Sequence, residues 1–535
     1  MKAGSYFIRI IAGVLASAFC AFALLSCVYR QTDILGDCNG DGKVNSIDSN
    51  YICRSILGEK ILLLEENADL NEDGLKNEAD KNLLKEYLAG TFLPGDRFSD
   101  IYINGMDIEK YAVVYPADHT DFEKWTAELL VTSLKDLCGA ELSLRPDSEK
   151  EQQYEFLIGN TNRKESQDWD ADAEKFLIFS RSGKIILKGE NYLVAGGVGY
   201  INSLLENSKS EWNTQTELNI PKEIKSRPVK WQDPDRIFLF IGDGMGLNHT
   251  KMSTDEKATV EYAEGIISAP DEKGFDTFWP STFTNIGSAV TLNIQNSTTD
   301  SAAAATALST GCKTLNGALG MIPCDLDGDG EENEYRSVQN VREAAALKGK
   351  ATAVLSTDRQ TGATPNGFLV HHSSRKDKDI ILKQQTALDM SRLACNYLWC
   401  SYDSDDLFSE FCDALDTCDD NPGGFFIMTE EAMIDKYSEK MDYDNAIRTV
   451  KRLNKVTAYT SVYAMCHWDS LVILTADHET GGLTPGEDNV WRWTSDGEHT
   501  SLNVPVFAMG SGTEYFNGTT CQNTDIAKFL FEAVD

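Results

Sequence analysis

The chain has 535 residues, which is too long for one compact core, and its content of 41% hydrophobic and 10% aromatic residues excludes a disordered protein. A formal net charge of -35 disfavours nucleic acid and anionic lipid surfaces as partners, because the long-range field repels them. A phosphate-bearing ligand therefore needs local positive charge, from metal ions or from a suitably placed arginine.

Residues 1–27 have the pattern of a bacterial export signal. Lys2 and Arg9 supply the positive start, and the nearly uniformly apolar stretch of roughly 16 residues that follows is short of the ~20 that a bilayer needs. The stretch ends in Leu-Leu-Ser-Cys, which resembles a lipobox in which Cys27 would be acylated after cleavage. We expect a secreted or surface-bound protein, lipid-anchored through Cys27; the alternative is an uncleaved membrane anchor.

Residues 33–93 contain two copies of a loop whose spacing is typical of calcium binding. Gly42 and Gly74 stand at the sixth position, where an EF-hand-type loop turns sharply, and each loop precedes an apolar helical stretch. Oxygen-bearing side chains fall at positions one, three, five, nine and twelve, namely Asp37, Asn39, Asp41, Asn45 and Asp48, then Asp69, Asn71, Asp73, Asn77 and Asp80. The alternative is a pair of Asp/Asn-rich surface turns.

This repeat resembles a dockerin module, an all-α pair of EF-hand-like units. The resemblance rests on the duplicated loop, on Asp at position twelve and on the loop-then-helix order. It implies two Ca²⁺ ions, calcium-dependent folding and docking onto a cohesin-bearing scaffold.

Residues 96–228 alternate between strand and helix patterns and predict a small α/β domain. We expect strands in 101–116, a helix over 123–139, a buried strand over 154–162, a hairpin over 176–190 and a final helix over 192–206. The segment resembles the accessory domain that precedes the catalytic domain in certain glycoside hydrolases. It has no catalytic constellation, so we interpret it as a structural spacer.

Residues 235–535 carry the chemistry. The apolar run RIFLFIG predicts a central parallel strand that places Asp243 at its carboxyl end, where open α/β sheets bind ligands. The alanine-rich run after Asp300 predicts a helix with Ser301 at or near its N-terminus, where backbone amides favour a phosphate anion. A simple helix-capping role for Ser301 is compatible with this interpretation.

Further metal-type side chains stand at the ends of other predicted strands. Asp477 and His478 follow one apolar run, Glu430 and Asp435 follow another, and His499 precedes a third. Carboxylate and imidazole groups converging from separate strands predict a metal centre.

In this region the chain resembles the alkaline phosphatase family, through the ordered motifs IGDGMG, DSAAAATAL, ATP followed by SSR, TEEAMID, TADHETGG and EHT. The resemblance implies a three-layer α/β/α sheet domain. It also implies two Zn²⁺ ions, one on Asp243, Asp477 and His478 and one on Asp435 and His499, and one Mg²⁺ ion on Asp243, Thr364 and Glu430. Arg375 matches the arginine that clamps phosphate.

The implied reaction is phosphate monoester hydrolysis in two in-line steps. Ser301, activated by the first zinc, becomes phosphorylated, and water on the second zinc then releases the phosphate. Two positions depart from the family. Glu439 stands where the second zinc usually has a histidine, and Gly362 stands where an outer magnesium-site Asp or His is common.

Three further features stay open. The short segment between Arg375 and Glu430 favours a monomer. The acidic insert Asp325–Gly330 is interpreted equally well as half a calcium loop or as a solvated turn. Among the thirteen cysteines, Cys395 with Cys400 and Cys412 with Cys418 could form local disulfides, or the thiols could stay reduced.

The residues of this region disfavour several competing functions. A sulfatase is disfavoured because DSAAAA lacks the motif for formylglycine conversion, and a phosphodiesterase because the arginine clamp is present. An exported chain is an improbable cytosolic phosphoglycerate mutase. A scaffold-docked protein with a degenerate or phosphodiesterase-type catalytic domain is the remaining alternative, and the intact first zinc set favours an active phosphomonoesterase.

Overall fold

The structure is a computed structural model, and it describes residues 68, 100–208, 215–255, 259–262, 265–268, 277–325, 334–388, 394–488 and 490–535. The predicted export signal, Cys27 and the ten predicted calcium ligands lie outside these residues, as does most of the acidic insert. The chain divides into two compact units. One comprises Met1–Glu109, Leu134–Glu141 and Leu205–Asn219, and the other comprises Lys110–Ser133, Leu142–Leu204 and Ile220–Asp535.

In the first unit, three short strands form a sheet of their own. β1 (Asp100–Ile103) pairs antiparallel with β2 (Met106–Asp107) and parallel with β8 (Gln215–Leu218). The remaining sheets described below belong to the second unit.

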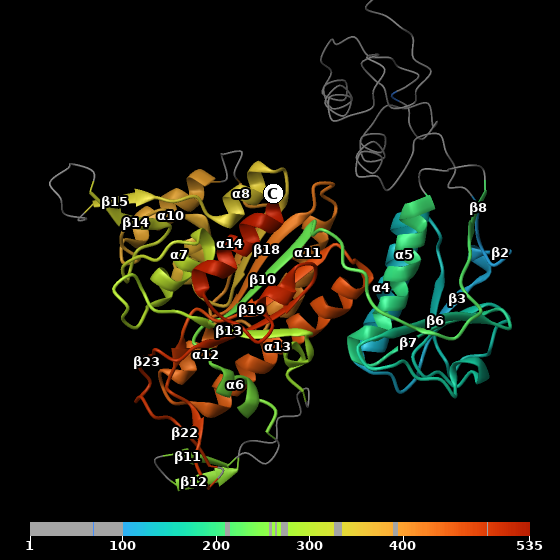
Figure 1. Ribbon diagram of the computed structural model, residues 1–535, viewed down its shortest axis with the longest axis horizontal. Coiled ribbons are helices and arrows are strands. Elements are labelled where there is room, and N and C mark those ends of the chain that lie inside the picture. The colour runs from blue at the N-terminus through green and yellow to red at the C-terminus, as the bar shows by residue number, and fades with distance from the viewer. Residues whose placement is uncertain are drawn as a thin grey trace, which may run out of the picture. The chain divides into compact units, whose positions relative to one another are not determined.

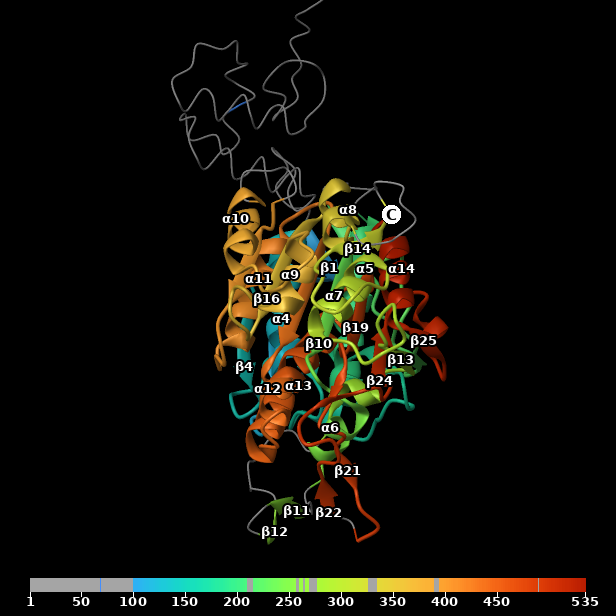
Figure 2. The same cartoon turned by 90° about the vertical axis from the view of Figure 1, so that its left-hand side faces the viewer.

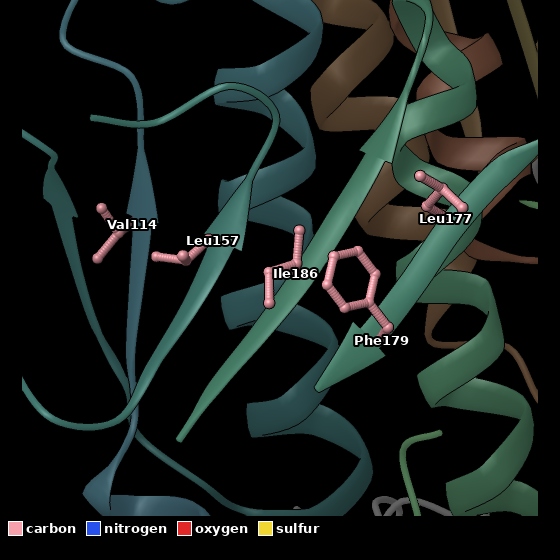
Figure 3. Close-up of a cluster of buried hydrophobic side chains, with 5 residues drawn as sticks. All are labelled: Val114, Leu157, Leu177, Phe179 and Ile186. Carbon is pink, nitrogen blue, oxygen red and sulfur yellow. The ribbon is translucent and has the colours of Figure 1, made fainter. Parts of the chain in front are cut away.

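A six-stranded sheet forms the core of the predicted accessory domain. Its order is β4 (Ser143–Pro146), β3 (Ala112–Tyr115), β5 (Glu155–Ile158), β7 (Lys184–Gly189), β6 (Phe176–Arg181) and β9 (Ser226–Arg227). Val114, Leu157, Ile186, Phe179 and Leu177 are buried together along one face, where the register aligns the first four in a row (Figure 3). β5, β6 and β7 are buried on both faces over most of their lengths, as their continuous apolar runs favour.

The local predictions for this segment are confirmed. The helices are α4 (Asp121–Cys138) and α5 (Gly196–Ser208), close to the predicted bounds. In the hairpin, Arg181 pairs with Lys184, and Ser182 and Gly183 both have positive φ angles, of 53° and 84°. A two-residue turn of this kind matches the twist of the strands it joins and needs residues that tolerate the left-handed region.

An eight-stranded sheet forms the core of the predicted catalytic domain (Figure 1). Its order is β17 (Tyr397–Cys400), β16 (Ala351–Ser356), β18 (Phe425–Glu431), β10 (Arg236–Gly242), β19 (Ser470–Thr475), β24 (Val504–Met509), β13 (Asn285–Val290) and β25 (Thr520–Gln522). The first five strands are parallel, and β24 runs antiparallel to both of its neighbours. The central strand β10 is buried over Ile237–Ile241, as its continuous apolar run predicts.

Two groups of helices cover the sheet, which confirms the predicted α/β class with helices on both faces (Figures 1 and 2). One group contains α7 (Ser301–Thr310), α8 (Val341–Leu347), α9 (Ala363–Leu369) and α14 (Asn523–Val534), which contact one another. The other contains α11 (Leu407–Asp419), α12 (Met433–Ser438) and α13 (Tyr443–Cys466). Among the described residues, no helix is both long and apolar enough to cross a membrane.

The cysteines of the described segments are free thiols. They include Cys395, Cys400, Cys412 and Cys418, so neither of the two local disulfides considered from the sequence is present. Burial raises the pKa of the Cys412 thiol to about 11, which keeps this thiol protonated and unreactive near neutral pH.

Candidate active site

The site lies at the carboxyl ends of three adjacent parallel strands. Asp243 follows β10, Glu430 lies at the end of β18, and Asp477 follows β19 by two residues. Because parallel strands end at the same edge of the sheet, these carboxylates converge although they are far apart in the sequence. The sequence pattern, in which an apolar run is followed by an acidic residue, therefore correctly predicts that these acids lie at the carboxyl ends of the strands.

Asp243, Asp477 and His478 form the first cluster of ligand-type atoms. Their ligand atoms lie within 4.8 Å of one another, and His478 Nε2 is 3.3 Å from both Asp243 Oδ1 and Asp477 Oδ2. Those two carboxylate oxygens are buried and accept no hydrogen bond. Burial and the neighbouring Asp477 raise the pKa of Asp243 well above its ordinary value. Buried, unpaired, mutually repelling carboxylates fit a bound cation.

Asp435, His478 and His499 form a second cluster that shares His478 with the first. The two imidazole rings stack at 3.6 Å between centroids, and His499 Nε2 is 3.5 Å from Asp435 Oδ1. His499 Nδ1 lies 3.1 Å from the Thr299 carbonyl oxygen, which orients the ring so that Nε2 faces Asp435. Burial alone would lower the pKa of His499, but the contact with Asp435 raises it to about 9.

Two residues that sequence reasoning missed hold this second cluster. Thr480 Oγ1 donates a hydrogen bond to Asp435 and lies 3.2 Å from His478 Nδ1. Lys436 Nζ lies 2.6 Å from Asp435 Oδ2 and brings a positive charge to the cluster. The available signals were weak: Thr480 stands two residues after His478, and Lys436 directly follows Asp435.

Glu439, predicted as a ligand of the second metal, lies outside the cluster in the described structure. It follows α12 as the helix-capping residue, and its side chain is 45% exposed. Its Oε1 atom lies 3.9 Å from Lys436 Nζ. Asp435 and Glu439 are one helical turn apart, but only Asp435 is buried with the histidines.

The predicted magnesium ligands Thr364 and Glu430 lie on neighbouring elements. Thr364 is in the first turn of α9, and its buried Oγ1 has no hydrogen-bond partner. Glu430 is buried and accepts a hydrogen bond from Ser356, its register partner on β16. Burial and the nearby Asp358 raise the pKa of Glu430 to about 8, against the smaller lowering effect of the hydrogen bond from Ser356. Hard oxygen donors of this kind fit a small divalent cation.

Ser301 is the first residue of α7, as predicted, and the residue that caps the helix is Asp300. The Asp300 side chain accepts a hydrogen bond from Ala303 N at 3.0 Å. Ser301 is buried, and its Oγ lies 3.4 Å from Nε2 of His478, the residue that the two ligand clusters share. The hydroxyl therefore stands at a helix N-terminus and beside the metal-type ligands at the same time.

Arg375 reaches the same place from a different segment. Its Nη1 lies 3.2 Å from Asp300 Oδ2, and its backbone N donates to the Gly317 carbonyl at 2.7 Å. A guanidinium held in this way by Asp300, the residue before Ser301, is suited to bidentate contact with an anion.

Together, the sheet edge and the converging carboxylate and imidazole groups define an α/β domain with a candidate metal site. Comparison with known families identifies two domains. The family model described as alkaline phosphatase matches residues 235–397 and 406–496. The model for the type I dockerin domain matches residues 35–89. The chain therefore contains an alkaline phosphatase domain and, N-terminal to it, a dockerin domain, which confirms both family resemblances.

Curated relatives show similarity at moderate identity. Alkaline phosphatase 3 of Bacillus subtilis is 27% identical over 331 residues, which cover 51% of this chain and 66% of that protein. The alkaline phosphatase of Escherichia coli is 37% identical over 155 residues, which cover 29% of this chain and 28% of that protein. The matches thus span less than two thirds of either relative's length. Among solved structures, the alkaline phosphatase of the Antarctic bacterium TAB5 aligns with 57% of this chain and 99% of its own, at 23% identity and a TM-score of 0.47.

Proposed function

We propose that the catalytic domain hydrolyses phosphate monoesters through a phosphorylated Ser301. The observation that carries the proposal is the position of Ser301 Oγ, 3.4 Å from His478 Nε2 and at the N-terminus of α7, beside two clusters of metal-type ligands. A helix N-terminus and Arg375 supply the positive potential that a chain of net charge -35 needs in order to bind a phosphate dianion.

In the proposed reaction, Ser301 Oγ attacks phosphorus while the bond from phosphorus to the ester oxygen breaks and the alcohol leaves. Water then attacks the phosphoserine and restores the hydroxyl, with inorganic phosphate as the product. Arg375 binds two phosphate oxygens, and Asp300 keeps its guanidinium in place. Metal ions at the clusters, when bound, would lower the pKa of the nucleophile and stabilise the leaving alkoxide.

The proposed metal assignment follows the ligand types. Asp243, Asp477 and His478 would hold one Zn²⁺, and Asp435 and His499 would hold the second. Asp243, Thr364 and Glu430 would hold Mg²⁺, because this set contains only oxygen donors.

Hydrolysis of an aryl phosphate at alkaline pH tests the proposal. With zinc and magnesium supplied, the intact chain should turn over, and Ser301→Ala should lose on the order of 10³-fold or more in kcat/KM. Ser409→Ala, in the exposed part of α11, is the matched control and should retain full activity. An intact chain inactive with every divalent metal offered would refute the enzyme assignment.

We also propose that the dockerin domain fixes the enzyme to an extracellular scaffold bearing cohesin modules. The match to the dockerin family over residues 35–89 supports this, and two calcium ions on the repeated loops would be required for docking. A pull-down of the full chain by a cohesin should need calcium and should fail for Asp37→Ala combined with Asp69→Ala. Binding that persists in a calcium chelator would count against the proposal. We further propose that the chain is exported and that Cys27 carries a lipid anchor.

A further inference from the structure

Asp358 lies beside the proposed magnesium ligands although no ligand motif includes it. It follows β16, and its backbone N donates to Ser356 Oγ at 2.8 Å. Ser356 Oγ in turn donates to the carboxylate of Glu430. A short chain of two hydrogen bonds therefore connects the turn at Asp358 to the buried acid of the site.

The carboxylate of Asp358 fills the space in front of Gly362. A Cβ added at Gly362 would lie 2.6 Å from Asp358 Oδ2 and 2.9 Å from Asp358 Cγ. Gly362 directly precedes α9, whose first turn carries Thr364. Its φ of -57° and ψ of 149° suit any residue, so backbone strain does not account for glycine here. The absence of a side chain at position 362 makes room for the Asp358 carboxylate.

The proposed cation site itself contains unsatisfied oxygen atoms. Thr364 Oγ1 and Asp243 Oδ1 have no hydrogen-bond partner, and the two residues are only 1% and 3% exposed. Asp358 is connected to Glu430 through the Ser356 hydroxyl, and its carboxylate lies where a side chain at position 362, two residues before Thr364, would project. A further negative charge next to unpaired buried oxygens is unfavourable unless a cation compensates it.

We infer that Asp358 is part of the divalent-cation site formed by Asp243, Thr364 and Glu430, and that it occupies the place of a side chain at position 362. This inference rests on the proposed function, because it assumes that a cation binds at Thr364 and Glu430. Asp358 contributes charge and an oxygen acceptor to a hard cation such as Mg²⁺, which prefers carboxylates and keeps bound water. Its loss should weaken magnesium binding by about tenfold or more, as is common for groups that support metal ligands.

Magnesium titration of the zinc-loaded full chain by calorimetry tests the inference without any measurement of turnover. Asp358→Asn should bind Mg²⁺ at least about tenfold more weakly than the wild type. Gly362→Ala should also weaken binding, because the added methyl group displaces the carboxylate. Asp379→Asn, an exposed acid in the first turn of α10 (Lys378–Leu388), is the matched charge control and should bind as the wild type does. Retained zinc and an unchanged melting temperature verify that each variant is folded.

A transplanted carboxylate gives the sharpest comparison. Asp358→Ala should bind Mg²⁺ weakly, and Asp358→Ala with Gly362→Asp should recover most of the affinity, because the new side chain enters the vacated space. Wild-type affinity in Asp358→Asn would overturn the inference and leave the proposed function intact. If Asp358→Ala and the double variant bind Mg²⁺ equally weakly, the claim that Asp358 occupies the place of a side chain at position 362 would be overturned. A wild-type protein that binds no Mg²⁺ would overturn both the inference and the magnesium part of the proposed function.

Discussion

The Asp300 carboxylate caps α7 through Ala303 N and also lies 3.2 Å from Arg375 Nη1. One side chain thus contacts both the helix that begins with Ser301, the proposed nucleophile, and the arginine proposed to bind phosphate. Ser301 is the next residue in the chain, so any shift of Asp300 reaches it directly.

The two roles of Asp300 can be separated by substitution. Asp300→Asn keeps a good capping residue, so the free energy of unfolding should change little, whereas Asp300→Ala should lose about 1 kcal/mol. Both variants should bind inorganic phosphate about two- to fivefold more weakly, because the partly exposed ion pair with Arg375 contributes modestly. Chemical denaturation and phosphate inhibition constants measure the two effects. Unchanged phosphate binding in both variants would contradict the positioning role.

Metal removal should destabilise the protein more at alkaline than at acidic pH. Without cations, burial and Asp477 raise the folded-state pKa of Asp243, and burial and Asp358 raise that of Glu430 from 4.5 to about 8. A raised folded pKa gives stability that is present at low pH and is lost as the pH rises through that value. The metal-free protein should therefore weaken between about pH 4.5 and pH 8. Bound metal should compensate for this loss.

Thermal unfolding with and without metals, at pH 5.5 and pH 8, measures this difference. The increase in Tm caused by zinc and magnesium should be larger at pH 8, where the carboxylates bind metal without first releasing protons. An equal or smaller increase at pH 8 would be inconsistent with metal binding by these acids.

The six-stranded sheet contains a buried ion triad whose loss should be costly. Glu155 is fully buried, 3.1 Å from Arg163 Nε and 2.9 Å from Lys184 Nζ, and those partners are 5% and 3% exposed. Glu155→Gln removes the buried charge partner that Arg163 and Lys184 share, and leaves Lys184 with the exposed carboxylate of Glu151 at 3.2 Å. It should destabilise the protein by about 3–5 kcal/mol. Glu149→Gln, which removes an exposed partner of Arg145, should change stability by less than about 1 kcal/mol. Urea denaturation of the two variants makes the comparison.

The same triad should also make the free energy of unfolding fall at acidic pH. Burial would raise the pKa of Glu155, but Arg163, the Gln152 backbone and Lys184 together lower it below 4.5. A lowered folded pKa gives stability that is present above the unfolded value and is lost as the pH falls through the folded value. The free energy of unfolding should therefore decline below about pH 4.5, and less so in Glu155→Gln. Parallel acid profiles in the two proteins would contradict this assignment.

Local sequence patterns predict the framework of the site well. The apolar run before Asp243 predicts a strand that ends at this acid, and the alanine-rich run predicts a helix with Ser301 at its start. Both are observed, as β10 and α7. The Ser182–Gly183 turn is similarly local, since its residue types tolerate positive φ.

Residues whose role depends on tertiary contact were not predictable from such patterns. Thr480 and Lys436 act through Asp435, and their contacts exist only because α12 and the segment after β19 meet at the sheet edge. Asp358 becomes relevant because Gly362 leaves space for it. Glu439 illustrates the converse. Its spacing of one turn from Asp435 predicts a shared face, but α12 ends at Ser438 and the Glu439 side chain is 45% exposed, whereas Asp435 is buried.

Direct detection of phosphoserine is the measurement that tests the central claim most closely. The zinc-loaded chain is mixed with an aryl phosphate, quenched in acid within one turnover and digested, and the peptide containing Ser301 is analysed by mass spectrometry. The account predicts one phosphate on Ser301 in the intact chain, and none on this peptide in Ser301→Ala, whose turnover is lost. Normal turnover by Ser301→Ala, or a phosphate found on a different residue of the intact chain, would contradict it.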